Sequence, residues 1–218
     1  EEPMLIKPLA AILLTLTALN SLDALAGNLA SRVNQARQRC LKPRQNGLTV
    51  EFKNPPTGMV QHYRASTTQR ALFPIYRGIV DEFGSVLQGM ISGGDEFAVR
   101  PYLHSIARDL KAKQTREGLT SAQTICLVSC VTNILMEPDE DVFPTTSMDM
   151  AVADGKGFCR HYMMTTKYML DRMSIQTRAG FSWDHTFLYF NHGQRKYIFD
   201  PTVSDGMSDC AFFSTENL

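Results

Sequence analysis

The chain lacks an excess of charge of either sign, and this absence narrows the choice of partners. Its 218 residues carry 22 Lys and Arg against 22 Asp and Glu. It also has no run of like charge, no internal repeat and no low-complexity stretch. A domain that binds nucleic acid usually presents a basic surface, so we do not expect nucleic acid as a partner. The hydrophobic content of 44% supports one substantial core, in one domain or in one domain with a helical extension.

A long uninterrupted apolar run is missing as well. The most apolar stretch lies near the N-terminus, but Thr, Asn, Ser and Asp residues interrupt it, so we expect no stable membrane span. Residues 4–26 have the charged, apolar and Ala-x-Ala parts of a secretory signal peptide, which would make the protein secreted or periplasmic. Apolar residues spaced by three and four from Leu5 to Val33 fit a packed amphipathic helix instead, in a protein that is cytoplasmic or delivered into a target cell. We favour the helix.

Cysteines are few, and their number is odd. Of the five, Cys126 and Cys130 are four residues apart and would share one face of a predicted helix. No histidine or further cysteine clusters near them in the sequence, so we expect core packing rather than a metal site. We expect neither a metal nor a cofactor. If disulfides form, at least one cysteine stays unpaired, which is compatible with a working thiol.

The order of sequence patterns predicts the organisation of the chain. Prolines, glycines and asparagines between Cys40 and Gly58 predict a loop or linker around a short strand at 48–52. We therefore divide the chain into an N-terminal helix and linker, 1–58, and a second domain, 59–218. In the second domain helical periodicity precedes strand-like segments, which favours an α+β fold with a helical layer followed by an antiparallel sheet. The predicted helices are 67–90, 101–113 and 121–136.

One cysteine, Cys159, stands in a different context from the others. It follows the glycine-rich sequence 154–158 and precedes a stretch with helical periodicity, 160–172. A thiol at a helix start lies near unpaired backbone N–H groups and the positive end of the helix dipole, and both favour the thiolate. A buried structural cysteine would also explain this residue, because free cysteine packs as a small hydrophobe.

Two strand-like segments downstream of this cysteine, separated by a turn, predict a hairpin over 183–200. With His192 and Gly193 at the centre of the turn, His185 lies directly opposite Asp200. Directly opposed side chains have Cβ atoms roughly 4.5–5.5 Å apart, so the carboxylate can hold the imidazole. The other ring nitrogen would then exchange a proton with a thiol.

Each of these residues also has a simpler interpretation. His185 could begin a core strand, and Asp200 could cap a turn before Pro201. The cysteine, the histidine and the aspartate together favour catalysis. Trp183 shares the strand face of His185 by alternation, and it would line the same cleft or the core. We expect the remaining histidines to be non-catalytic, and these are His62, His104, His161 and His192.

Five short segments match, in order and spacing, the pattern of a known family. They are Gly157-Phe158-Cys159, the helix 160–172, Ile175 to Gly180, His185-Thr186-Phe187 and Asp200-Pro201-Thr202. With these segments, the region 145–206 resembles the transglutaminase-like superfamily of papain-like cysteine enzymes. One departure is the position of the tryptophan: family members often carry it just after the histidine, whereas Trp183 comes two residues before.

The resemblance implies a papain-like fold and a Cys-His-Asp triad. Cys159 would be the nucleophile, His185 the general base and acid, and Asp200 the orienting carboxylate. Such a triad attacks amide bonds of protein or peptide substrates, and we favour a thiol protease. A glutamine deamidase or transglutaminase of the bacterial toxin or effector type is one alternative, and a binding module of the same fold without turnover is another. The Cys159 backbone N–H would be one oxyanion donor, with Gln123 and Asn133 as unsupported candidates for the second.

Overall fold

The computed structural model describes residues 28–42, 48–64, 96–139, 141–142, 146–182, 184–204, 210–216 and 218. The signal-like stretch 4–26, the helix predicted at 67–90 and Trp183 lie outside these residues, and the expectations about them stay predictions. Among the described helices, none is both long and apolar enough to cross a membrane.

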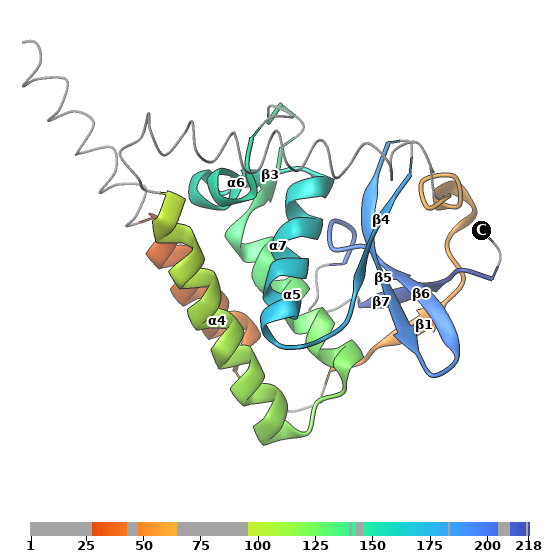
Figure 1. The fold of residues 1–218 in the computed structure, drawn as a ribbon, viewed down its shortest axis with the longest axis horizontal. Helices are drawn as coiled ribbons and strands as arrows, with labels where there is room; N and C mark the ends of the chain where they lie inside the picture. The colour runs from red at the N-terminus through yellow and green to blue at the C-terminus, as the bar shows by residue number, and fades with distance from the viewer. Residues whose placement is uncertain are drawn as a thin grey trace, which may run out of the picture.

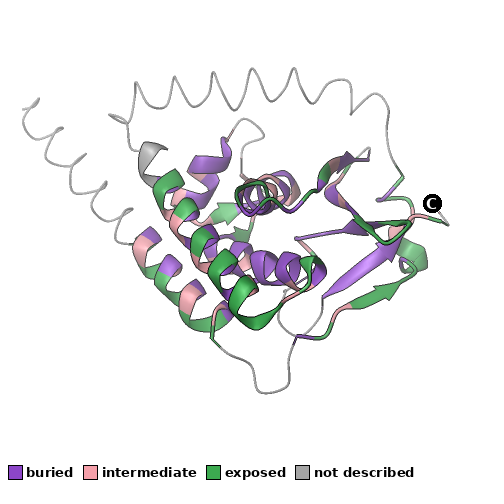
Figure 2. Ribbon diagram, turned by 60° about the horizontal axis from the view of Figure 1, so that its bottom comes forward, coloured by how far each residue is buried: buried purple, intermediate pink, exposed green. Residues whose placement is uncertain are grey.

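The helices gather on one side of the molecule, with α5 and α7 between α4 and the sheet (Figure 1). They are a helix over 28–40, α4 (Glu96–Glu117), α5 (Ser121–Leu135), α6 (Met148–Asp154) and α7 (Cys159–Arg172). The predicted helices 101–113 and 121–136 are confirmed as α4 and α5, although α4 extends beyond its prediction at both ends. α5 is apolar on nearly all sides, and it is buried along most of its length (Figure 2).

A five-stranded sheet forms the other side, in the order β1-β7-β6-β5-β4. Its strands are β1 (Glu51–Lys53), β4 (Arg178–Phe181), β5 (Thr186–His192), β6 (Arg195–Phe199) and β7 (Ala211–Ser214). The last four strands pair antiparallel, whereas β1 pairs parallel to β7. The short strands β2 (Glu137–Pro138) and β3 (Lys156–Gly157) pair with each other, and a 3₁₀ turn, η1, spans Thr57–Met59. The α+β class is confirmed, but the main sheet is mixed rather than purely antiparallel.

The segment expected to be a linker contributes to this sheet. The predicted strand at 48–52 is present as β1, which forms the edge beside β7. Leu29, Val33 and Ala36 of the preceding helix lie in the same core cluster as α5 and α7. The division near residue 58 stays a prediction, but described residues on both sides of it share one core and one sheet.

Four of the five cysteines form two disulfides that attach α5 to two distant segments of the chain. Cys130 pairs with Cys40 at the end of the helix over 28–40, and Cys126 pairs with Cys210 just before β7. Both α5 cysteines are buried as expected, but the expectation that they only pack in the core is wrong. The bridges join residues 90 and 84 apart in sequence. In the chain-entropy model a loop of that size corresponds to about 4–5 kcal/mol of stabilisation each.

The β5–β6 hairpin differs from its predicted register by two residues. His192 pairs with Arg195, so Gly193 and Gln194 are the central turn residues. Gly193 has φ of 60°, a conformation that glycine adopts at no steric cost and that two-residue hairpin turns require. The predicted direct opposition of His185 and Asp200 is therefore wrong. A shift of two residues preserves strand alternation, so both side chains remain on the same face.

Candidate active site

Cys159 is the first residue of α7, as its glycine-rich approach predicts. The chain reaches it through Gly157, where a Cβ atom would lie 3.0 Å from Cβ of His161 and 3.1 Å from Sδ of Met136. Glycine therefore allows the chain to pass close beneath the first turn of the helix. Because Cys159 occupies the first helical position, its backbone N–H has no acceptor within the helix. All five cysteines are described, and Cys159 alone is outside a disulfide.

The imidazole of His185 lies between the thiol of Cys159 and the carboxylate of Asp200. Its Nε2 is 2.7 Å from Oδ2 of Asp200, and the ring lowers the pKa of the Cys159 thiol while that thiol raises the pKa of the ring. Since Nε2 engages the carboxylate, Nδ1 is the nitrogen that remains for the sulfur. The Asp200 side chain is fully buried, whereas 15% of the His185 side chain is exposed. The three residues predicted from the sequence are thus joined in the order Cys, His, Asp.

The three groups shift one another's pKa values toward a charged pair. Burial raises the pKa of the Cys159 thiol, but the hydrogen bond and charge of His185, with hydrogen bonds from Thr186, lower it below its ordinary value. Burial lowers the pKa of His185, but the hydrogen bonds and charges of Asp200 and Cys159 raise it to about 10. Burial likewise raises the pKa of Asp200, and the bonds from His185 and Thr202 bring it below its usual value. These shifts favour a thiolate beside an imidazolium more than the isolated groups would.

Both oxygens of Asp200 accept hydrogen bonds. Oδ1 accepts from the backbone N–H of Thr202 at 3.0 Å and from its hydroxyl at 2.6 Å. Oδ2, which contacts His185, also accepts from the hydroxyl of Tyr63 at 3.0 Å. Several donors on a buried carboxylate keep it ionised and fix its orientation. The Thr202 contact belongs to a turn that Asp-Pro-Thr favours, so this residue could have been anticipated.

Tyr63 is a site residue that the sequence does not predict. Its side chain is fully buried, with ring centroids 5.4 Å from Phe187 and 5.5 Å from Phe213. Burial and then the negative charge of Asp200 raise the pKa of Tyr63 well above its usual range, so the hydroxyl stays a donor. The contact spans 137 residues of sequence, and no motif around Tyr63 signals it.

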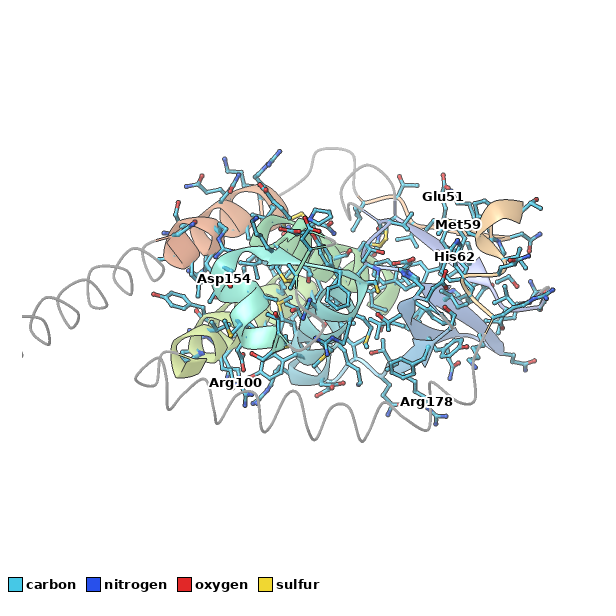
Figure 3. The ribbon with its side chains drawn as sticks, turned by 90° about the horizontal axis from the view of Figure 1, so that it is seen from above. Glu51, Met59, His62, Arg100, Asp154 and Arg178 are labelled. Atoms are coloured by element: carbon cyan, nitrogen blue, oxygen red, sulfur yellow. A yellow bond between two sulfur atoms is a disulfide. The ribbon has the colours of Figure 1, made fainter. Side chains whose placement is uncertain are left out.

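His62, next to Tyr63, lies at the exposed edge of the site. Its Nδ1 is 2.9 Å from Oδ2 of Asp184, and both side chains are about half exposed. The ring centroid of His62 is 6.5 Å from that of His185. Figure 3 shows His62 with Met59 on the sheet side of the molecule, away from the helical side. The two neighbouring residues therefore have different positions at the site: Tyr63 supports Asp200 from the interior, and His62 lies at the exposed edge.

Thr186 lies close to the sulfur of Cys159. Its backbone N–H and its hydroxyl both favour the thiolate. The hydroxyl oxygen is buried and has no partner of ordinary hydrogen-bond geometry among the described residues. Thr186 directly follows His185 in the sequence, but the expected side-chain alternation gave no reason to assign it to the site.

The two amides considered as oxyanion donors are already hydrogen-bonded elsewhere. Gln123 caps α5, where its Oε1 accepts from the backbone N–H of Thr120 at 3.0 Å and its Nε2 donates to the carbonyl of Leu48 at 3.2 Å. Nδ2 of Asn133 donates to several carbonyls, that of Ser204 at 2.9 Å among them. We therefore drop both residues as oxyanion donors.

His161 is buried beside the nucleophile but faces other partners. Its Nε2 lies 2.8 Å from the carbonyl oxygen of Thr146, and its Nδ1 accepts from the backbone N–H of Phe158 at 3.3 Å. Burial lowers the pKa of His161 to about 4, so the ring is neutral. These contacts hold the loop before α7 in place.

Comparisons with models of protein families, with curated proteins and with solved structures each found no match to this chain. The geometry of the site and the sequence pattern around it are therefore the grounds on which a function is proposed.

Proposed function

We propose that the protein is a cysteine enzyme of the transglutaminase-like, papain-like type that cleaves or transfers the acyl group of amide bonds in proteins or peptides. One observation carries the proposal: His185 lies 2.7 Å from the buried carboxylate of Asp200 and acts on the thiol of Cys159, which stands at a helix start and whose pKa the imidazole lowers. The resemblance of the region 145–206 to that superfamily supports the same chemistry. Among the reactions of this class, we favour proteolysis.

The reaction would begin with the thiolate. Sγ of Cys159 attacks the carbonyl carbon, a C–S bond forms, and the negative charge moves to the carbonyl oxygen. The backbone N–H of Cys159 donates to that oxyanion. The imidazolium of His185 then gives its proton to the leaving nitrogen, the C–N bond breaks, and a thioester remains.

The second half of the reaction decides the product. Neutral His185 removes a proton from water, which attacks the thioester and releases a carboxylic acid and the Cys159 thiol. A peptide bond treated in this way is hydrolysed, and a glutamine side chain is deamidated. An amine in place of water would give transglutamination. Asp200 keeps the imidazole in orientation through both halves and offsets its positive charge.

Mass spectrometry of a protein mixture treated with wild type or Cys159→Ala tests the proposal. New chain ends indicate proteolysis, full-length proteins with the mass of an amide-to-acid change indicate deamidation, and linked chains indicate transglutamination. Products that persist with Cys159→Ala would overturn the proposed nucleophile. If neither protein gives products, and iodoacetamide labels Cys159 only near the ordinary thiol pKa of about 8.5, the binding module would replace the enzyme.

The disulfides bear on where such an enzyme would work. Cys40–Cys130 and Cys126–Cys210 are buried bridges, and such bridges persist mainly in oxidising compartments. We therefore favour a secreted, periplasmic or otherwise extracytoplasmic site of action over the cytoplasm. Free-thiol counting on protein isolated under alkylating conditions tests this: one reactive thiol per chain is expected, and five would contradict it.

A further inference from the structure

A groove with basic walls lies between α4 and α7. Its volume is about 540 Å³, and its lining includes His104, Arg108, Lys111 and Arg172. The remaining lining residues are two alanines and a threonine, so small side chains leave room between the long ones. We call this feature the basic groove.

The cations of the basic groove have no carboxylate partner in the described part of the chain. Arg108 makes no hydrogen bond or ion pair with any described residue. The ammonium of Lys111 donates to neutral oxygens, including the carbonyl of Met173 at 3.1 Å. Arg172 stacks over the ring of Tyr168 and donates to its hydroxyl at 3.4 Å. Three positive charges therefore share one concave surface, and no carboxylate of the described residues is paired with them.

The described carboxylates of the two helices that line the groove are already engaged. Asp109, Glu117 and Asp171 are the acidic residues of α4 and α7 whose side chains are described. Each forms an ion pair on another face of its helix, with Arg37, Lys113 and Lys167 respectively. In a chain with equal numbers of acidic and basic residues, the basic groove is thus a local concentration of positive charge. A concave surface of one sign raises the local concentration of an oppositely charged ligand.

We propose that the basic groove docks an acidic segment of a partner protein. Two guanidinium groups, Arg108 and Arg172, can each bind a carboxylate through paired N–H donors. Nucleic acid fits less well, because three cations neutralise few phosphates and the chain has no wider basic field. A membrane surface also fits less well, because the large hydrophobic side chains exposed among the described residues lie at the sheet: Phe52 belongs to β1, and Val203 lines a pocket with Lys53 and Phe213.

The basic groove is separate from the candidate active site. Cys159 and Arg172 are the first and last residues of α7, a helix of 14 residues, so they lie about 20 Å apart along its axis. The helical repeat also turns Arg172 roughly 140° away from Cys159 around that axis. A segment docked in the groove leaves the thiol accessible. The inference therefore goes beyond the proposed function and holds whether or not Cys159 is catalytic.

Binding of a fluorescein-labelled oligoglutamate peptide to the full chain tests this inference, with fluorescence anisotropy as the readout. Wild type and Cys159→Ala are expected to bind equally at low ionic strength, and binding should weaken as salt screens the charges. Arg108→Glu/Arg172→Glu is expected to weaken binding about tenfold or more. The matched control is Arg195→Glu/Lys196→Glu, which makes the same change of charge on exposed residues of β6 and should bind within about twofold of wild type.

Two outcomes would overturn the proposal. One is equal binding by the groove variant and the control variant. The other is binding of oligothymidylate or of phosphatidylserine vesicles through Arg108 and Arg172 at least as tightly as oligoglutamate. If the double glutamate variant fails to fold, as judged by its melting curve, Arg108→Gln/Arg172→Gln carries the test and is expected to lose at least about threefold in affinity.

Discussion

Replacing Tyr63 with phenylalanine tests the hydrogen-bond chain from Tyr63 through Asp200 to His185. Phenylalanine keeps the ring that packs on Phe187 and removes only the hydroxyl, which donates to Asp200 at 3.0 Å. A hydrogen bond to a charged group contributes about 1.5–3 kcal/mol, and water cannot replace it at the fully buried Asp200 side chain. We therefore expect the free energy of unfolding to fall by about 2 kcal/mol, which lowers Tm by roughly 4–8 °C in a chain of this size.

Tyr162→Phe is a matched control for this loss of stability. Tyr162 is also almost fully buried, and its hydroxyl donates to the carbonyl of Met136 at 2.7 Å. That acceptor is neutral, so the expected loss is smaller, about 1 kcal/mol. Both variants lose a buried hydroxyl, but only Tyr63→Phe removes a hydrogen bond to a charged residue of the triad, Asp200.

The pKa of His185 distinguishes the two variants. Without the Tyr63 hydroxyl, the charge of Asp200 is less compensated and acts more strongly on the imidazolium. We therefore expect the pKa of His185 to rise by roughly half a unit to one unit in Tyr63→Phe and to stay unchanged in Tyr162→Phe. NMR titration of ring-labelled histidine measures it, with His185→Ala to assign the signal. A pKa that falls or stays constant in Tyr63→Phe, or that rises equally in the control, would refute the reasoning.

Three further predictions follow from the same structure. In His185→Ala, the Cys159 thiol loses the contribution of the imidazole while burial still raises its pKa, so alkylation by iodoacetamide at about pH 6 should slow at least tenfold; an unchanged rate would contradict the ion pair. The raised pKa of His185 stabilises the fold below the ordinary histidine value of 6.5, and this stabilisation is lost as pH rises toward about 10. The free energy of unfolding of wild type minus that of His185→Ala should therefore fall across this range, and a constant difference would contradict the linkage. Cys126→Ala/Cys210→Ala should lower Tm by at least about 8 °C under oxidising conditions, and a change below about 2 °C would show that the bridge adds little.

The hairpin shows what a sequence pattern can and cannot define. Strand-like alternation predicted both strands, because it reflects which side chains face the core. The same alternation repeats every two residues, so it cannot distinguish the predicted register from the observed one. The choice depends on whether Gly193 is the first or the second central residue of the turn, and both positions accept a positive φ. The prediction that His185 and Asp200 share one face of the hairpin is therefore correct, whereas the prediction that they lie directly opposite each other is wrong.

The parts of the site that escaped prediction come from contacts between distant segments. Tyr63 reaches Asp200 across 137 residues, and no local pattern distinguishes it from an ordinary core tyrosine. The spacing of Cys126 and Cys130 correctly predicts one helix face, but their partners lie 84 and 90 residues away. Local periodicity carries no information about such pairings, since they depend on how the layers pack.

The disulfides and the free thiol have a common structural consequence. α5 packs against α7, and its two cysteines attach it to the helix over 28–40 and to the approach to β7. α7 begins with Cys159, and β5, which begins just after His185, packs on α7 from the sheet. The bridges therefore restrain the helix that supports the nucleophile without including any residue of the triad. Reduction of both bridges frees α5 from its two attachments and so weakens the packing that supports α7. We therefore expect the reactivity of the Cys159 thiol and the free energy of unfolding to change together when the bridges are reduced.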